Sequence, residues 1–186
     1  MAASFRVLTA GYIGERVAST VSVVVDGDQI VIIDPGMVAD PSLMLDPLDE
    51  LGIAPEDVTD VVFSHHHPDH TLNAAWFPNA RYHDHWAIYR RDHWDSRPAE
   101  GFEVSAHVKL IETPGHTPQD ITTLIETEDG VVACTHLWWN NSGPAEDPYA
   151  TDAEALHAGR VRILELAALI VPGHGEWFRP DQDTPR

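Results

Sequence analysis

Four potential metal ligands, His65, His67, Asp69 and His70, lie within six consecutive positions of this chain. They directly follow a short apolar run, Val61 to Phe63, which is typical of a buried strand. Two histidines two residues apart in an extended segment point to the same side, so both can bind one cation. Asp69 and His70 begin the next predicted helix and diverge toward a second position. Because borderline cations such as zinc bind imidazole nitrogen together with carboxylate oxygen, the cluster predicts a metal centre.

A run of surface histidines or an expression tag is the alternative interpretation of this cluster. A tag would stand at a terminus, whereas this segment follows a strand that belongs in a core. The chain also carries 12 histidines in 186 residues. Metal binding is therefore the interpretation we favour.

The elements that position the cluster are predicted from apolar runs, helical spacing and turn residues. We expect strands over residues 21–25, 30–34, 61–63, 81–83, 107–112, 121–126, 131–134 and 170–171. We expect helices over residues 40–51, about 69–75, 84 to about 93, and 152–169. This order predicts one domain over residues 1–186, with two sheets, helices outside them and a loose tail from about residue 180.

Four motifs in this order resemble the metallo-β-lactamase fold superfamily. The signature His-x-His-x-Asp-His follows a buried strand, and the three others are Ile32-Ile33-Asp34-Pro35-Gly36, Thr113-Pro114-Gly115-His116-Thr117-Pro118 and Pro172-Gly173-His174-Gly175. The resemblance covers nearly the whole chain. It implies a four-layer αββα sandwich of the α/β (α+β) class, with the site at one edge of the two sheets.

The same resemblance implies two groups of ligands for two divalent metal ions. His65, His67 and His116 would hold the first ion, and Asp69, His70 and His174 would hold the second. We expect zinc, although iron and manganese accept the same ligands.

One position departs from the resemblance. Many hydrolases of this superfamily carry an aspartate that bridges the two metals after a strand, which here is Val131 to Cys134. His136 stands at that position, and an imidazole nitrogen does not bridge two cations as a carboxylate does. We favour His136 as a ligand of the second metal alone. The alternatives are that it contacts substrate or moves protons, marks a site with one tightly held metal, or simply packs.

These ligands predict a metal-dependent hydrolase. A pair of divalent cations lowers the pKa of bound water from 15.7 toward roughly 7 and polarises the group under attack. We expect the metal-bound hydroxide to attack the carbonyl of a small ester, thioester, lactone or amide, with Asp69 as the catalytic residue that orients the water. Trp138, Trp139 and Asn140 directly follow His136 and are the candidate substrate-binding residues.

Three other functions stay open at this point. By resemblance, the chain could be an iron-dependent persulfide dioxygenase-like oxidoreductase, or a phosphodiesterase or nuclease of the same superfamily. It could also be a metal-binding protein without activity.

Composition and length restrict the partners. The net charge is −19, from 11 basic and 30 acidic side chains, and such a surface repels phosphate backbones and anionic membranes. No apolar run approaches the ~20 residues that span a bilayer, and the start of the chain lacks the pattern of a leader peptide. The lone cysteine, Cys134, suits a reducing compartment and is expected to pack. We therefore expect a cytoplasmic protein with a small-molecule substrate and neither nucleic acid nor a membrane as partner.

Overall fold

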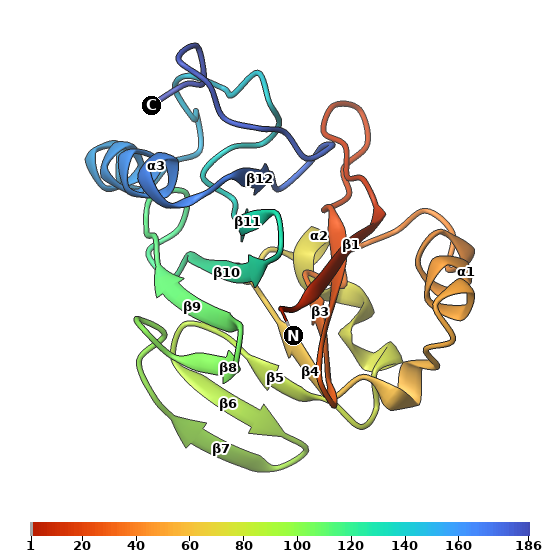
Figure 1. Cartoon of the computed structure of the whole chain (residues 1–186). Coiled ribbons are helices and arrows are strands. Elements are labelled where there is room, and N and C mark those ends of the chain that lie inside the picture. Colours follow the sequence, from red (N-terminus) through yellow and green to blue (C-terminus); the bar gives the residue numbers. More distant parts are fainter. Residues whose placement is uncertain (1) are drawn as a thin grey trace.

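The computed structural model describes residues 2–186 and consists of two β-sheets that face each other, with helices on both outer sides (Figure 1). The first sheet contains, in chain order, β1 (Ser4–Thr9), β2 (Val21–Asp26), β3 (Gln29–Ile33), β4 (Asp60–Val62), β5 (Arg81–His83), β6 (Ala87–Arg90) and β7 (His93–Ser96). The second contains, in spatial order, β12 (Leu169–Val171), β11 (Gly130–Cys134), β10 (Ile121–Thr127), β9 (Val108–Glu112) and β8 (Glu103–Ser105).

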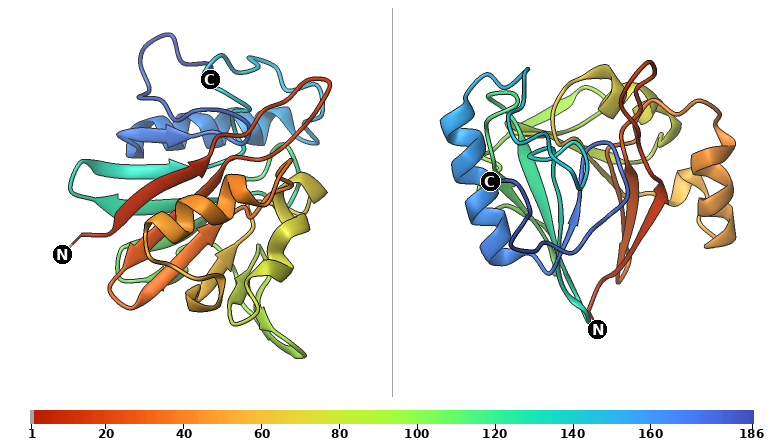
Figure 2. Two further views of the ribbon diagram at one scale, coloured as in Figure 1. Left: turned by 90° about the vertical axis from the view of Figure 1, so that its right-hand side faces the viewer. Right: turned by 90° about the horizontal axis from the view of Figure 1, so that it is seen from above.

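The helices form the two outer layers (Figure 2). They are α1 (Ser42–Glu50), α2 (Pro68–Thr71) and α3 (Ala153–Leu166), with short 3-10 helices at Pro55–Asp57 and Leu72–Trp76. Viewed from above, α1 flanks the first sheet and α3 flanks the second. This arrangement confirms the predicted αββα sandwich. No helix within residues 2–186 has the length and apolar character needed to cross a membrane.

Strand β3 shows how the central strands serve two cores at once. Val31 and Ile33 face the interior between the sheets, where they belong to the same cluster as Leu110 and Ile121. Ile32 faces the opposite way and packs in the cluster that contains Met44 of α1. Because both faces of the strand are covered, its sequence is a continuous apolar run rather than an alternating one.

On the other side, α3 packs against the second sheet. Asp152 caps this helix, since its side chain accepts a hydrogen bond from the backbone N–H of Ala155 at 2.9 Å. Leu156 and Ile163 are buried in the cluster that contains Ile170 of β12. The helix ends at Leu166, a little earlier than the spacing predicted, because the chain must leave it to enter β12 beside β11.

The sheet geometry brings the ends of several strands to one edge. Strands β3 and β4 are parallel, as are β11 and β12, and β9 runs in the same direction as β11 because β10 is antiparallel to both. The segments that follow these strands carry the predicted ligands. The two sheets are joined at this edge by the backbone hydrogen bonds from Ile121 to Ser64 and from Thr20 to Gly173, each 2.8 Å long.

The predicted helix over residues 84–93 is wrong. Asp84 does accept hydrogen bonds from the backbone N–H groups of Trp86 and Ala87, as a capping residue would, but the chain then forms the hairpin of β6 and β7. Tyr82, Tyr89 and Trp94 stack in succession across this hairpin, with ring centroids 5.7 and 5.1 Å apart. These cross-strand aromatic contacts favour the strand over the helix.

The tail also differs from its prediction. The indole Nε1–H of Trp138 donates a hydrogen bond to the carbonyl oxygen of Pro185 at 2.8 Å, and Thr184 is buried. The last residues are therefore packed against the domain.

Candidate metal centre

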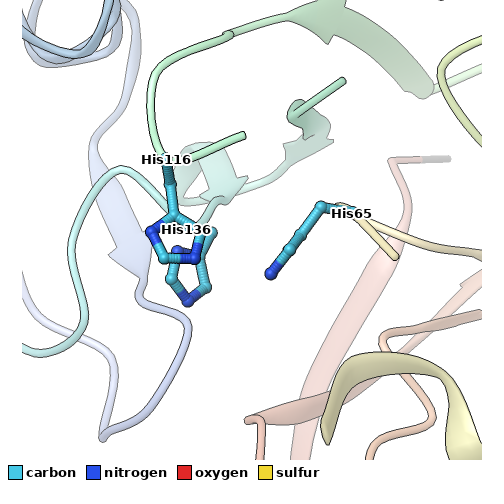
Figure 3. Close-up of side chains that lie close together, drawn as sticks. All are labelled: His65, His116 and His136. Atoms are coloured by element: carbon cyan, nitrogen blue, oxygen red, sulfur yellow. The ribbon is translucent and has the colours of Figure 1, made fainter. Parts of the chain in front are cut away.

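Three histidine nitrogens meet at the first position. His67 Nδ1 lies 2.9 Å from His65 Nε2 and 3.2 Å from His116 Nε2. Two ligands of one tetrahedral zinc ion, each about 2.0–2.1 Å from it, lie about 3.3 Å apart. The donor atoms therefore converge as ligands of one cation do. Figure 3 shows His65 and His116 approaching each other from separate segments of the chain.

The outer nitrogens of these rings are held by other side chains. His116 donates its Nδ1 proton to Asp147 Oδ2 at 2.8 Å, because a carboxylate can only accept. His65 Nδ1 lies 3.0 Å from the hydroxyl of Ser64. A histidine whose Nδ1 is protonated presents the lone pair of Nε2, so the contact with Asp147 fixes the ligating nitrogen of His116.

A second group forms around Asp69. Its Oδ2 lies 3.5 Å from His70 Nε2 and 3.7 Å from His174 Nε2. His70 Nδ1 binds Asp34 Oδ2 at 2.8 Å, and His174 Nδ1 donates to the carbonyl oxygen of Ala18 at 3.0 Å. In both rings Nε2 is again the nitrogen that faces inward.

His70 provides the direct test of whether a cation fits. Its Nε2 is buried and has no hydrogen-bond partner among the described residues. A buried nitrogen without a partner is costly unless something binds it. A divalent cation beside Asp69 would satisfy it, so the residues present fit a metal.

His136 lies between the two groups. Its ring centroid is 4.2 Å from that of His116 and 4.6 Å from that of His65 on one side, and 4.9 Å from His70 and 5.0 Å from His174 on the other. His136 also offers a ligand atom within 4.8 Å of those of each pair. Figure 3 shows its ring beside that of His116. Its Nε2 is 3.1 Å from His174 Nε2, whereas its buried Nδ1 has no partner in the described chain.

The glycine before His174 makes room for His136. A Cβ atom on Gly173 would lie 2.4 Å from His136 Cδ2. Any side chain there would displace the imidazole. The Pro-Gly-His-Gly motif therefore contains His174 and also leaves space for the ring of His136.

Burial and repulsion between neighbouring rings favour the neutral form of four of these imidazoles, because both lower the pKa. Burial, and then the neighbouring histidines, lower the pKa of His65 and of His136 well below the ordinary value. Burial also lowers the pKa of His67 and of His174. A neutral imidazole has a free lone pair, so these shifts favour metal binding.

A cavity of about 410 Å³ opens over the histidines. It is lined by the ligand side chains His67, Asp69, His116, His136 and His174, and by Ile13, Val17, Thr117, Pro118, Gln119, Trp139, Tyr149 and Thr151. A larger groove of about 880 Å³ runs along β1 and carries no potential ligand cluster of this kind. The smaller cavity is the candidate functional site because the candidate metal ligands line it.

Of the three candidate substrate residues, only Trp139 lines this cavity. The expectation for Trp138 was wrong, since its side chain is fully buried beneath α3 with Leu156. Asn140 lies outside the cavity lining and forms a tight turn that pairs with Gly143. The chain bends after β11 ends at Cys134, and the two neighbouring indoles point to different places, Trp138 into the core and Trp139 into the cavity.

Sequence reasoning missed Asp147, which organises this side of the site. Its Oδ2 accepts hydrogen bonds from His116 and also from the indole N–H of Trp139 at 3.1 Å. Trp139 stacks on Tyr149, with ring centroids 5.7 Å apart and an interplanar angle of 15°. No spacing signal connects Asp147 with His116, which lies 31 positions earlier. His66 does not join the other histidines of this segment, because its Nε2 contacts Asp84 Oδ2 at 3.2 Å.

Residues 14–175 match the sequence profile of the metallo-beta-lactamase superfamily. A Xenopus laevis protein named metallo-beta-lactamase domain-containing protein 1 is 30% identical over 83% of this chain and 70% of its own length. A Caenorhabditis elegans protein is 29% identical over 90% of this chain. The chain spans 50% of the length of that nematode relative.

Solved structures share the fold. A metallo-beta-lactamase candidate from Thermotoga maritima has a TM-score of 0.77 and 23% identity, over 97% of this chain and 100% of that chain. AidC, a dizinc quorum-quenching lactonase, has a TM-score of 0.63 and 19% identity, over 88% of this chain and 79% of its own. TTHA1623 in a di-iron-bound form has a TM-score of 0.68 and 21% identity, over 92% and 94% of the two chains.

Proposed function

The chain belongs to the metallo-β-lactamase superfamily, and from that premise we propose that it is a metal-dependent hydrolase that cleaves a small acyl substrate. The candidate bonds are those of esters, thioesters, lactones and amides. The observation that carries the proposal is the convergence of His65, His67 and His116 on one point and of Asp69, His70 and His174 on another, at the floor of one cavity.

We infer two divalent ions, with zinc as the first choice. The two groups of ligands support this count, as do the dizinc and di-iron centres of the two structural neighbours. When bound, such ions activate water and polarise a carbonyl group. His65, His67 and His116 would hold one ion, and Asp69, His70 and His174 would hold the other, with His136 between them.

The residues around the centre supply orientation and exclude bulk water. Asp69 lines the cavity with a side chain that is 15% exposed, so we assign to it the orientation of the attacking water and the acceptance of its proton. Trp139 and Tyr149 form an aromatic wall that would hold the substrate against the floor.

The test is turnover by the full chain loaded separately with zinc, iron and manganese. The substrates are simple ester, thioester, lactone and amide compounds, with a phosphodiester beside them. We expect the zinc form to hydrolyse at least one acyl class, and Asp69→Asn to lose that activity. His157→Ala removes an exposed histidine far from the cluster in the chain and is the matched control.

Other results would replace the proposal. Turnover of the phosphodiester alone would make the protein a phosphodiesterase. Oxygen uptake with a persulfide by the iron form would make it an oxidoreductase. Tight metal binding with no turnover of any compound would leave a metal-binding protein.

A further inference from the structure

The charge of the cavity is the first clue to its ligand. No lysine or arginine belongs to the cavity lining found within residues 2–186. Asp69 lines it, and Asp147 lies directly behind Trp139. Asp147 accepts hydrogen bonds from His116, Tyr149 and Trp139, so an acidic side chain rather than a basic one stands behind this wall of the cavity. Apart from bound metal, the described cavity lining therefore offers an anion neither lysine nor arginine.

Two arginines in the segments around the cavity are already engaged. Arg160, which interacts electrostatically with Asp147, donates hydrogen bonds to the carbonyl oxygens of Leu137, Pro144 and Ala145. Arg16 belongs to the loop between β1 and β2, which also supplies Ile13 and Val17 to the cavity. Its guanidinium group donates a hydrogen bond to the hydroxyl of Tyr12 at 3.3 Å and lies 5.5 Å from the centre of that ring. Arg16 is itself outside the cavity lining.

The apolar part of the cavity is the second clue. Ile13 and Val17 come from a loop of the first sheet, whereas Trp139 and Tyr149 come from the segment between β11 and α3. Ile13 is 38% exposed and Tyr149 is 69% exposed, so both side chains have surface available to a ligand in the cavity. The bond from Trp139 to Asp147 fixes the indole, so this aromatic surface is already formed without a ligand.

We propose that the cavity selects substrates whose acyl group is uncharged and apolar, and that it rejects acyl groups ending in a carboxylate. This inference rests on the proposed hydrolase function and narrows its substrate class. An alkyl chain would cover Trp139, Tyr149 and Ile13 and remove their surface from water. A terminal carboxylate in the same place would lose its hydration and find no lysine or arginine in the cavity lining to pair with.

The first experiment compares two matched substrates with the zinc-loaded full chain. p-Nitrophenyl hexanoate and mono-p-nitrophenyl adipate carry the same six-carbon acyl chain, which ends in a methyl group or in a carboxylate. We expect kcat/KM to be at least about tenfold higher for the hexanoate, and to rise from acetate to hexanoate. Equal values, or a preference for the adipate, would overturn the inference while leaving the hydrolase function intact.

A binding measurement decides the matter if no ester is turned over. Hexanohydroxamic acid and the monohydroxamic acid of adipic acid share a metal-binding head and differ only in the end of the tail. Titration calorimetry should show the neutral tail binding at least about tenfold more tightly. Equal affinity would refute the substrate class, whereas absent turnover with a clear preference would refute only the hydrolase function.

Two variants locate the preference in the cavity. Gln119→Lys adds a cation to the lining and should reduce the ratio of hexanoate to adipate kcat/KM about tenfold. Tyr149→Ser removes part of the aromatic wall and should reduce the ratio of hexanoate to acetate. Trp94→Ala removes an exposed tryptophan of β7 and is the control in which both ratios stay unchanged. If Gln119→Lys leaves the first ratio unchanged, charge in the cavity does not set the preference.

Discussion

Asp147 accepts the Nδ1 proton of His116 at 2.8 Å, although the two residues come from different loops. The same carboxylate oxygen accepts the indole N–H of Trp139. One buried side chain therefore positions both a proposed metal ligand and a wall of the pocket. Both contacts require the segment between β11 and α3 to pack against the site.

We predict that Asp147→Asn weakens zinc binding about 10- to 100-fold, because the loss of a carboxylate behind a ligating histidine commonly has an effect of this size. The amide can no longer offer a charged acceptor that favours the correct tautomer of His116. Competition with a chromogenic chelator measures the affinity. Glu146→Gln changes an exposed carboxylate next in the chain and is the control. If the two variants bind zinc equally well, Asp147 does not position His116.

His136 gives a prediction about stoichiometry. We expect His136→Ala to reduce bound zinc from two ions to one per chain. The variant would lose the Nε2 atom that lies beside His174 in the second group, whereas the first group of three histidines would remain complete. His136→Asp should retain two ions, since a carboxylate can bridge them. Elemental analysis after dialysis gives the count. Equal loss of both ions from the alanine variant, or no loss, would show that His136 is not a ligand of the second ion alone.

A substitution at Gly173 tests the role of His136 in metal binding without changing a proposed ligand. A methyl group at this position would meet His136 Cδ2 at 2.4 Å, so Gly173→Ala should displace the ring and lower the occupancy of the second metal. Gly175→Ala is the matched control because its nearest contact would be the Cβ atom of Asn140 at 3.1 Å. Metal content and thermal unfolding of both variants should be measured together. Equal metal content in the two would mean that the position of the His136 ring does not matter.

The parts of the fold that depend on local sequence were predictable. Strand β4 (Asp60–Val62), which was predicted over residues 61–63, follows from an apolar run, and the cap at Asp152 follows from a hydrogen bond within a few residues. The helix over residues 84–93 failed because the local bonds of Asp84 are the same in a turn and in a helix cap. The stacking of Tyr82, Tyr89 and Trp94 across strands favours the hairpin over the helix. A pattern within a few consecutive residues does not reveal such contacts between strands.

The same limit applies to the site. Short sequence motifs surround four of the histidines, so these could be identified from the sequence: His65, His67, His116 and His174. Asp147 has no such motif, and its importance depends on a loop that returns to His116. Trp138 and Trp139 are indistinguishable by type, and only the direction of the segment places one in the core and the other in the cavity.

Asp26, at the end of β2, joins the two sheets far from the metal site. Its Oδ2 accepts hydrogen bonds from the hydroxyl of Ser105 at 2.6 Å and from the backbone N–H of His107 at 2.9 Å, and its Oδ1 binds His107 Nδ1 at 2.8 Å. Although burial raises the pKa of Asp26, these bonds outweigh it and lower the pKa below the ordinary value of 3.8. The stabilisation that Asp26 contributes is therefore fully present above that value and is lost as the pH falls through the lower pKa of the folded state.

We accordingly predict that Asp26→Asn lowers the free energy of unfolding at pH 7 by about 1–3 kcal/mol, because hydrogen bonds to a charged group are replaced by weaker ones. The difference from the unchanged protein should shrink steadily below pH 3.8, where the carboxyl becomes protonated. Urea unfolding of the metal-free protein at several pH values measures both quantities without a contribution from metal release. Asp28→Asn, an exposed carboxylate in the same turn, should change neither. A difference that stays constant down to pH 2 would mean that the charge of Asp26 does not hold the sheets together.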